Sequence, residues 1–365
     1  MARRVVFLRS KSVGGVEPRL DRAARALADA GHEVHAILWD REATRAETET
    51  RGRYTVHRVR FRAPYNRPSL AWKLPGWWRR AFRLLRTIRP DVVHAADWDT
   101  IPPAMRARDA WGAKVVFDIW DYYAQMITAR IPRFVRSALA RREAFAIRDA
   151  DLVIVPDLAR KPPFRWEPRR VIEIVNVPEE RAFTPEPHEG FRVFYGGNLS
   201  KDRGLQYLIP ACERAGARLV VAGQGPDEGE LIAQVRRSAS AEYLGYLPHD
   251  QVLRHAAAAD AIPLLYDPSV PINRLASPNK LYEAMMLRKP VLVSEGILIA
   301  DLVRDEQFGI VVPYGDTERL VDAMKGMIAA PDMGAAMGAR GRAVYESRYR
   351  WEVMRERLVE AYSRL

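Results

Sequence analysis

Lys280 and Glu283 have the residue types and the spacing to bind a phosphorylated nucleoside. They lie in residues 277–294, which read as a loop, a helix, a tight connection and a strand. Ser277 and Asn279 are helix-capping types that mark where the helix begins. The N–H groups of a helix N-terminus attract phosphate, and a carboxylate one turn further on can accept hydrogen bonds from ribose hydroxyls. A core-packing helix with a surface Lys-Glu pair explains the same pattern.

The first half of the chain begins with a strand, a glycine loop, a helix and a second strand. The strands are predicted at residues 5–8 and 34–39, and Gly14-Gly15 forms the loop. This order is typical of a parallel α/β sheet. One glycine pair does not supply a dinucleotide fingerprint, which needs three glycines and a later acidic residue. Gly15 lets a ligand approach the backbone closely, and a plain tight turn is the alternative.

The second half repeats this pattern after a proline-rich linker. The linker is predicted at residues 178–187, and the next strand, at 192–195, runs into Gly196-Gly197. The length of 365 residues, of which 48% are hydrophobic, provides for two cores. We therefore predict an α/β protein of two Rossmann-like domains, formed by residues 1–186 and 187–344.

Residues 279–285 (NKLYEAM), together with 288–291 (RKPV), resemble the donor-binding signature of retaining glycosyltransferases of family 4. These enzymes have the GT-B fold, in which two Rossmann-like domains face each other across a cleft. A C-terminal helix, here residues 345–365, returns to the first domain. The family's second glutamate, eight residues before Glu283, is Leu275 here, so the chain resembles a variant branch with Ser-Pro-Asn-Lys in this loop.

The resemblance also implies roles for individual residues of the second half. Glu283 grips the nucleotide ribose, while Arg203 and Lys280 contact the diphosphate and act catalytically by stabilising the leaving group. An arginine that is usual in the family at position 198 is Asn198 here. With Gly15 of the first half, the donor-binding candidates are Gly197, Asn198, Gly223, Leu247, Ser277, Asn279 and Glu283. No metal ion and no cofactor are expected, because the cationic groups themselves stabilise the diphosphate.

The resemblance places the acceptor on the first half. A histidine that the family often has near position 120 is Trp120 here, so Asp118 and Asp121 are the candidate polar groups. We name Asp121 as the third catalytic candidate, although each aspartate also fits an ordinary strand-end cap. Residues 97–99 (DWD) mimic the metal-binding D-x-D of the other glycosyltransferase fold. The second Rossmann-like half argues against that fold.

Positive charge is concentrated in the first half of the chain. The net charge is +12, but residues 1–186 hold 36 basic and 23 acidic residues, an excess of 13. Residues 51–89 hold twelve basic residues and no acidic one, and Trp72 and Trp77 lie among them. We predict that residues 60–79 dock on an anionic membrane surface. Buried tryptophans under a basic surface that meets a soluble acidic acceptor are the alternative, and nucleic acid is not favoured.

Cys212 is the single cysteine, which excludes an internal disulfide and suits a reducing compartment. The N-terminus runs directly into a strand, and no apolar run is long enough for a bilayer, so neither a signal peptide nor a membrane span is expected. We predict a cytoplasmic protein that associates peripherally with the inner face of the membrane.

The predicted function is transfer of a sugar from a UDP- or GDP-sugar, with retention of configuration, by a hexosyl- or N-acetylhexosaminyltransferase. The acceptor is a glycan, a lipid-linked sugar or a small molecule. Two alternatives remain: a GT-B nucleotide-sugar epimerase, and a noncatalytic protein that binds nucleotide sugars or nucleic acid.

Overall fold

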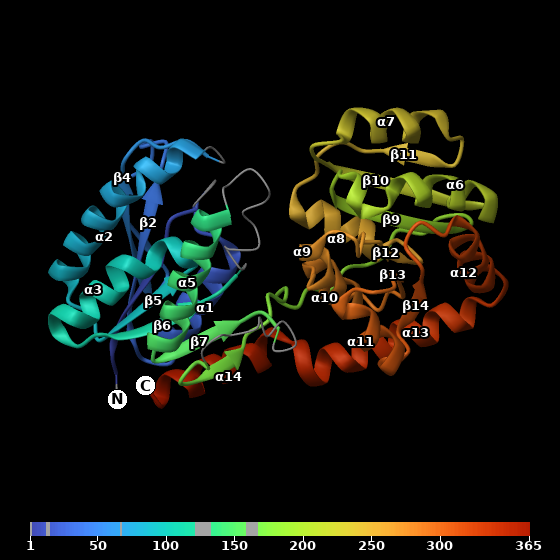
Figure 1. Cartoon of the computed structure of the whole chain (residues 1–365). Helices are drawn as coiled ribbons and strands as arrows, with labels where there is room; N and C mark the ends of the chain where they lie inside the picture. Colours follow the sequence, from blue (N-terminus) through green and yellow to red (C-terminus); the bar gives the residue numbers. More distant parts are fainter. Residues whose placement is uncertain (1, 12–14, 66–67, 121–132, 158–166) are drawn as a thin grey trace. The chain divides into compact units, whose positions relative to one another are not determined.

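The computed structural model describes residues 2–11, 15–65, 68–120, 133–157 and 167–365. Two compact units form, one from Met1–Asn176 with Met354–Leu365 and the other from Val177–Val353 (Figure 1). The division falls ten residues before the predicted domain boundary, because residues just after 176 bond to the second unit. Tyr345 donates to the carbonyl of Pro178 at 3.2 Å, and Arg181 pairs with Asp250.

The described residues of the first unit form an eight-stranded sheet in the order β3-β4-β2-β1-β5-β6-β7-β8. Every pair of neighbours is parallel except β3 and β4. The central strands are continuous apolar runs, as expected for a sheet that is covered on both faces. The strands are β1 (Arg4–Arg9), β2 (Glu33–Asp40), β3 (Thr48–Arg51), β4 (Tyr54–Arg60), β5 (Val92–Ala96), β6 (Lys114–Asp118), β7 (Leu152–Val155) and β8 (Val171–Glu173).

Helices cover both faces of this sheet. Apolar residues of α2 (Leu74–Ile88), α3 (Ile101–Trp111) and α5 (Arg133–Asp149) share one core with Val93 and Ala95 of β5. The residue between them, His94, points to the opposite face, because side chains alternate along a strand. There it meets Tyr362 of α14 (Trp351–Ser363), and α1 (Pro18–Asp29) packs on β2. Two short 3-10 turns, η1 (Pro68–Trp72) and η2 (Trp98–Thr100), complete this unit.

The described strands of the second unit form two three-stranded parallel sheets, β11-β10-β9 and β12-β13-β14. A bridge between Val193 and Ala261 joins the two sheets. The strands are β9 (Phe191–Asn198), β10 (Ala217–Gln224), β11 (Ala241–Tyr243), β12 (Ile262–Leu264), β13 (Val291–Ser294) and β14 (Gly309–Val312). The helices are η4 (Lys201–Arg203), α6 (Leu205–Ala215), α7 (Glu228–Arg237), α8 (His249–Ala257), α9 (Pro271–Arg274), α10 (Asn279–Met286), α11 (Leu298–Glu306), α12 (Thr317–Ala329) and α13 (Pro331–Val344).

The C-terminal segment leaves the second unit and packs on the first. A π-helical turn at Tyr345–Tyr349 precedes α14, where one continuous helix was predicted. The Sδ atom of Met354 accepts a hydrogen bond from the backbone of Val175 at 3.3 Å, and Arg170 donates to the carbonyl of Ala361 at 3.2 Å. The prediction that this helix returns to the first domain is confirmed.

The segment predicted to face a membrane divides between core and surface. Trp77 is fully buried and stacks on Trp39 with 5.4 Å between ring centroids, so within residues 60–79 it is not available to a membrane surface. Its place on the apolar face of α2 explains the burial. Trp72, in contrast, is 87% exposed, and Arg67 lies outside the described residues. Within the described part of the chain, no helix has the length and apolar character of a membrane span.

Candidate active site

A pocket of about 550 Å³ lies in the second unit, where β9 and β10 end and α10 begins. Parallel strands present ligand sites at their carboxyl ends, and a helix N-terminus adds its free N–H groups there. The pocket brings together most of the residues predicted for the donor: Gly197, Asn198, Arg203, Gly223, Leu247, Asn279, Lys280 and Glu283.

Two glycines let the ends of β9 and β10 approach each other. Gly223 pairs with Gly197 in the sheet and has φ +135°, which favours glycine. A Cβ atom on Gly223 would lie 1.8 Å from the carbonyl oxygen of Gly197. A Cβ on Gly197 would lie 2.8 Å from Nζ of Lys280. Gly223 therefore permits the close approach of the two strand ends, and Gly197 leaves the space in which the lysine side chain lies.

Lys280 occupies the first turn of α10 and is half-buried in the pocket wall. Its Nζ atom lies over the ring of Tyr195, 4.1 Å from the centroid. Desolvation lowers the pKa of Lys280 to about 8; the charge of Glu283 opposes this shift and that of Arg203 adds to it. The pocket therefore contains a cation that has lost part of its hydration, which favours contact with an anionic ligand.

Glu283 is buried one turn further along α10, and its Oε1 atom lies 2.9 Å from Nε2 of His249. The hydrogen bond that His249 donates to the Glu283 carboxylate raises the pKa of His249 despite partial desolvation. His249 begins α8 and lines the same pocket, with 61% of its side chain exposed. His249 was not predicted from the sequence. A histidine after a proline has no spacing pattern of its own, and only the fold brings it to Glu283.

Arg203 is held in place by neighbours of the second unit. Its Nη1 donates to Asp202 and to Asn273, each at 2.7 Å, and its guanidinium lies over the ring of Tyr266 at 4.3 Å. Asn273 is buried and also donates to Asp202 at 3.0 Å. Neither Asn273 nor Tyr266 was identified from the sequence, although both lie in the loop that leads to the central motif. These contacts hold the Arg203 guanidinium in a fixed orientation at the pocket wall, as a preorganised binding group requires.

Three of the predicted site residues, Ser277, Gly15 and Asp121, are not among the residues that line this pocket. Ser277 lies just outside the pocket lining and shares a hydrogen bond of 2.7 Å with the hydroxyl of Tyr282. Gly15 belongs to the first unit and follows β1 with φ +132°, a conformation suited to glycine. Asp121 lies outside the described residues, so its assignment as a catalytic residue stays a prediction.

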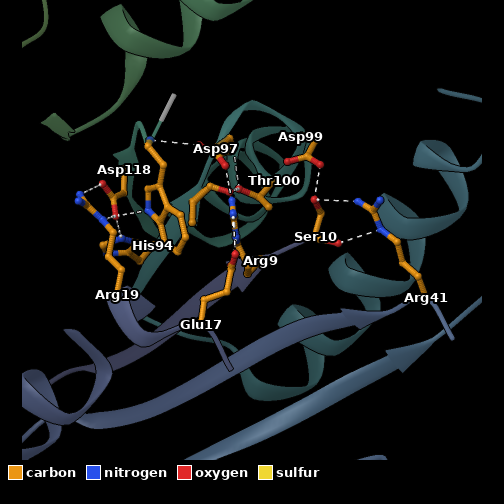
Figure 2. Close-up of polar contacts among 12 residues, drawn as sticks. Arg9, Ser10, Glu17, Arg19, Arg41, His94, Asp97, Asp99, Thr100 and Asp118 are labelled. Carbon is orange, nitrogen blue, oxygen red and sulfur yellow. Dashed lines mark hydrogen bonds and ion pairs between the residues drawn. The ribbon is translucent and has the colours of Figure 1, made fainter. Parts of the chain in front are cut away.

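Asp118 of the first unit belongs to a buried polar network (Figure 2). Arg19 donates to both of its carboxylate oxygens, at 2.7 and 3.2 Å, and the indole N–H of Trp120 donates at 2.7 Å. His94 contacts the same carboxylate at 3.3 Å. Desolvation opposes ionisation, but Arg19 and His94 together hold the pKa of Asp118 well below its usual range. Through its contacts with Arg19 and His94, Asp118 at the end of β6 links this strand to α1 and β5.

The two aspartates of the DWD motif also have partners at the carboxyl ends of these strands (Figure 2). Arg9 pairs with Asp97 and Glu17, and its guanidinium lies 3.9 Å from the centre of the Trp120 ring. Asp99 accepts a hydrogen bond from Ser10, and burial raises its pKa. Within the part of the chain that the structure describes, no group of three or more His, Cys, Asp or Glu residues could hold a metal ion.

Two family models match successive parts of the chain. The model described as "Glycosyl transferase 4-like domain" matches residues 14–184, and "Glycosyl transferases group 1" matches residues 190–330. Glycogen synthase of Mycobacterium tuberculosis (strain CDC 1551 / Oshkosh) is 24% identical, with 96% of this chain and 91% of that protein covered. Alpha-maltose-1-phosphate synthase of Mycolicibacterium smegmatis is 25% identical over 47% of this chain and 48% of its own length.

Solved structures share the fold over nearly the whole chain. Sucrose-phosphate synthase from Thermosynechococcus elongatus has a TM-score of 0.81 at 16% identity and 99% coverage of both chains. Anabaena HepE in complex with UDP has a TM-score of 0.72 at 17% identity, with coverage of 99% of this chain and 100% of that chain. The predicted fold class is confirmed: the chain belongs to the glycosyltransferases with the GT-B fold.

Proposed function

We propose that this glycosyltransferase takes its sugar from a nucleotide diphosphate donor and retains the anomeric configuration. The convergence of Lys280, Arg203 and Glu283 on one pocket of about 550 Å³ carries the proposal. Two cations suit a diphosphate, and a buried carboxylate one helical turn away suits the hydroxyls of a ribose. Because a structural neighbour, Anabaena HepE, was solved with UDP, UDP-sugars are the first donors to test, followed by GDP-sugars.

In the proposed reaction, the bond from the anomeric carbon to the donor phosphate oxygen breaks, and a bond from that carbon to the acceptor oxygen forms on the same face. The acceptor proton passes to the departing phosphate oxygen. Lys280 and Arg203 stabilise the negative charge that develops there, together with the N-terminus of α10. The first unit holds the acceptor, a glycan, a lipid-linked sugar or a small molecule, and the donor sugar is a hexose or an N-acetylhexosamine.

Isothermal calorimetry with UDP- and GDP-sugars tests donor binding, and nuclear magnetic resonance of the product reports the anomeric configuration. We expect Lys280→Ala and Arg203→Ala to lower kcat by roughly a hundredfold, the magnitude typical of one lost transition-state donor. Arg236→Ala, an exposed change on α7, is the matched control and should leave turnover unchanged. If both pocket variants retain wild-type turnover, the diphosphate binds elsewhere. An inverted product, or an epimerised donor without transfer, would exclude a retaining transferase.

A further inference from the structure

A second pocket, in the first unit, has a volume of about 420 Å³ and lies between α2, η2, α3 and α5. Its lining is largely apolar and includes Trp78, Trp98, Ile101, Met105 and Phe145. The indole N–H of Trp78 donates to the carbonyl of Asp99 at 2.8 Å, which leaves the apolar part of that ring for the pocket wall. The chemistry of this lining suits a hydrocarbon rather than a sugar or a nucleotide.

The helices around this pocket are strongly basic. α2, α3 and α5 together contain eleven arginines against three acidic residues. The three helices cover the same face of the sheet, because their apolar residues share one core. Their outer side carries exposed arginines: Arg79, Arg80, Arg83, Arg86, Arg106, Arg141, Arg142 and Arg148. We call this side of the first unit the basic face.

Arg142 lines the pocket itself and is exposed on α5. Arg108 lines it as well, and donates to the carbonyl of Asp149 at 3.1 Å; Asp149 is the one acidic residue among the described residues of the lining, and its carboxylate pairs with Arg148 at 2.6 Å. Large apolar side chains are also exposed on α5 and just before α2. Phe145 of α5 is 45% exposed, Phe134 of the same helix is 75% exposed, and Trp72 just before α2 is 87% exposed. An apolar hollow with a cationic rim and protruding aromatic rings matches the two parts of an anionic lipid, its chain and its phosphate.

We propose that the basic face docks on an anionic phospholipid membrane and that the pocket takes one acyl chain of a bound lipid. The arginines neutralise the lipid phosphates, Phe134 and Trp72 enter the interface, and Arg142 lies beside the phosphate of the lipid in the pocket. Charge complementarity favours a membrane, and the apolar pocket separates this partner from a soluble polyanion, which needs no such cavity. The proposal moves the predicted contact from residues 60–79 to a surface built by three helices.

Sedimentation with vesicles tests the electrostatic part of the proposal on the full chain. The protein should pellet with phosphatidylglycerol vesicles at low salt, stay in the supernatant with phosphatidylcholine vesicles, and be released by salt. Arg79→Ser combined with Arg83→Ser should weaken binding by about tenfold or more, since each basic residue at an anionic surface contributes. Arg236→Ser with Arg237→Ser removes the same charge from exposed positions on α7 of the second unit and should bind like the wild type.

Equal losses in the two double variants would show that only net charge matters, and would overturn a specific basic face. Failure to pellet with phosphatidylglycerol at low salt would overturn membrane docking altogether. Binding to heparin or DNA that is lost with Arg79 and Arg83, while vesicle binding is absent, would assign the face to a soluble polyanion instead.

Filling the pocket tests the acyl chain separately. Met105→Phe leaves every charge in place and fills the hollow with a bulkier, rigid side chain that adds no indole, so it should weaken vesicle binding and abolish quenching of tryptophan fluorescence by phosphatidylglycerol with brominated acyl chains. The comparison is made in a Trp72→Phe background, which removes the exposed indole from the signal. Ile328→Ser, at a 38% exposed position on α12, is the control for a surface apolar change. Unchanged vesicle binding and quenching in Met105→Phe, with normal donor binding, would overturn the lipid pocket.

Discussion

Glu283 is a buried carboxylate at the wall of the pocket in the second unit, and a hydrogen bond links one of its oxygens to His249. Replacing it with glutamine keeps the shape but removes the charge that strengthens hydrogen bonds from ribose hydroxyls. Hydrogen bonds to charged groups contribute about 1.5–3 kcal/mol, so Glu283→Gln should weaken donor binding by at least about tenfold. Calorimetry measures the affinity, and circular dichroism reports the fold. Glu318→Gln on α12, an exposed change, is the control. Unchanged affinity in a folded variant would remove Glu283 from the ribose site.

His249 should make donor binding depend on pH. Its pKa is raised by the hydrogen bond to Glu283, with the charges of Arg181 and Asp250 acting in opposite directions on it. When a ribose hydroxyl donates a hydrogen bond to the Glu283 carboxylate in its place, His249 loses this partner. The pKa of His249 then returns toward its ordinary value, and His249 releases a proton. Proton release on binding means that affinity rises with pH through the raised pKa of His249 and then levels off.

Calorimetry from about pH 5 to about pH 7.5 checks this prediction, since ordinary histidines titrate in that interval. The upper limit stays below the pKa of Lys280, which is about 8, so that loss of the lysine charge does not obscure the result. His249→Asn should flatten the profile, because asparagine does not titrate. A variant that retains the full pH dependence would assign the proton to another group.

At the scale of elements, the site depends on how closely β9 and β10 approach. Gly223→Ala should destabilise the second unit by about 2 kcal/mol or more, because the new Cβ would lie 1.8 Å from the Gly197 carbonyl oxygen and φ is +135°. Donor affinity should fall as well, since the strand ends form the pocket. Gly229→Ala on α7 has nothing within 4 Å and should be neutral or slightly stabilising. Equal stability of the two variants in thermal denaturation would contradict this account.

The sequence was sufficient for elements whose signal is local. The apolar runs at residues 5–8 and 34–39 became β1 and β2, and the central helix begins at Asn279 as α10, although its N-cap is Pro278 and neither Ser277 nor Asn279 caps it with its side chain. Contacts between distant segments could not be predicted. The residues around Trp77 in the sequence do not indicate that it stacks on Trp39. One tryptophan belongs to an amphipathic segment and the other to an apolar one, and either pattern is compatible with many partners.

The sequence also indicated which residues come together in the second unit. The helix motif and the family resemblance singled out Arg203, Lys280 and Glu283, and these residues line one pocket; their roles toward a donor stay predictions. The groups that tune them come from other segments: His249 from the start of α8, Asn273 from α9, and Tyr195 from β9. Such partners depend on the tertiary fold. A single polar or aromatic residue has no periodic pattern from which its contacts could be predicted.

For the whole molecule, the two compact units have separate hydrophobic cores, so a defect buried in one should be measurable apart from the other. Substitution of Asp118 introduces such a defect into the first unit. Its carboxylate accepts two hydrogen bonds from Arg19, and both side chains are buried. Asp118→Asn leaves the guanidinium charge without its counter-charge, and the loss of one member of a buried ion pair costs about 3–5 kcal/mol.

We therefore expect Asp118→Asn to lower the melting temperature of the first unit while the donor affinity of the second unit stays at the wild-type value. Arg19→Met added to the variant should restore part of the loss, because the unpaired charge is removed. Asp109→Asn, an exposed change on α3, should leave the melting curve unchanged. Scanning calorimetry with and without a UDP-sugar separates the two units, and a single unshifted transition in Asp118→Asn would contradict the assignment.

The same pair predicts how the first unit responds to acid. The pKa of Asp118 is held below its usual range in the folded protein, so its contribution is fully present above the unfolded value of about 4 and is lost as the pH falls toward the folded value. The wild-type first unit should therefore lose more stability than Asp118→Asn below about pH 4, and the two melting temperatures should converge there. Curves that stay parallel down to about pH 2 would show that Arg19, rather than ionised Asp118, sets the stability of this network.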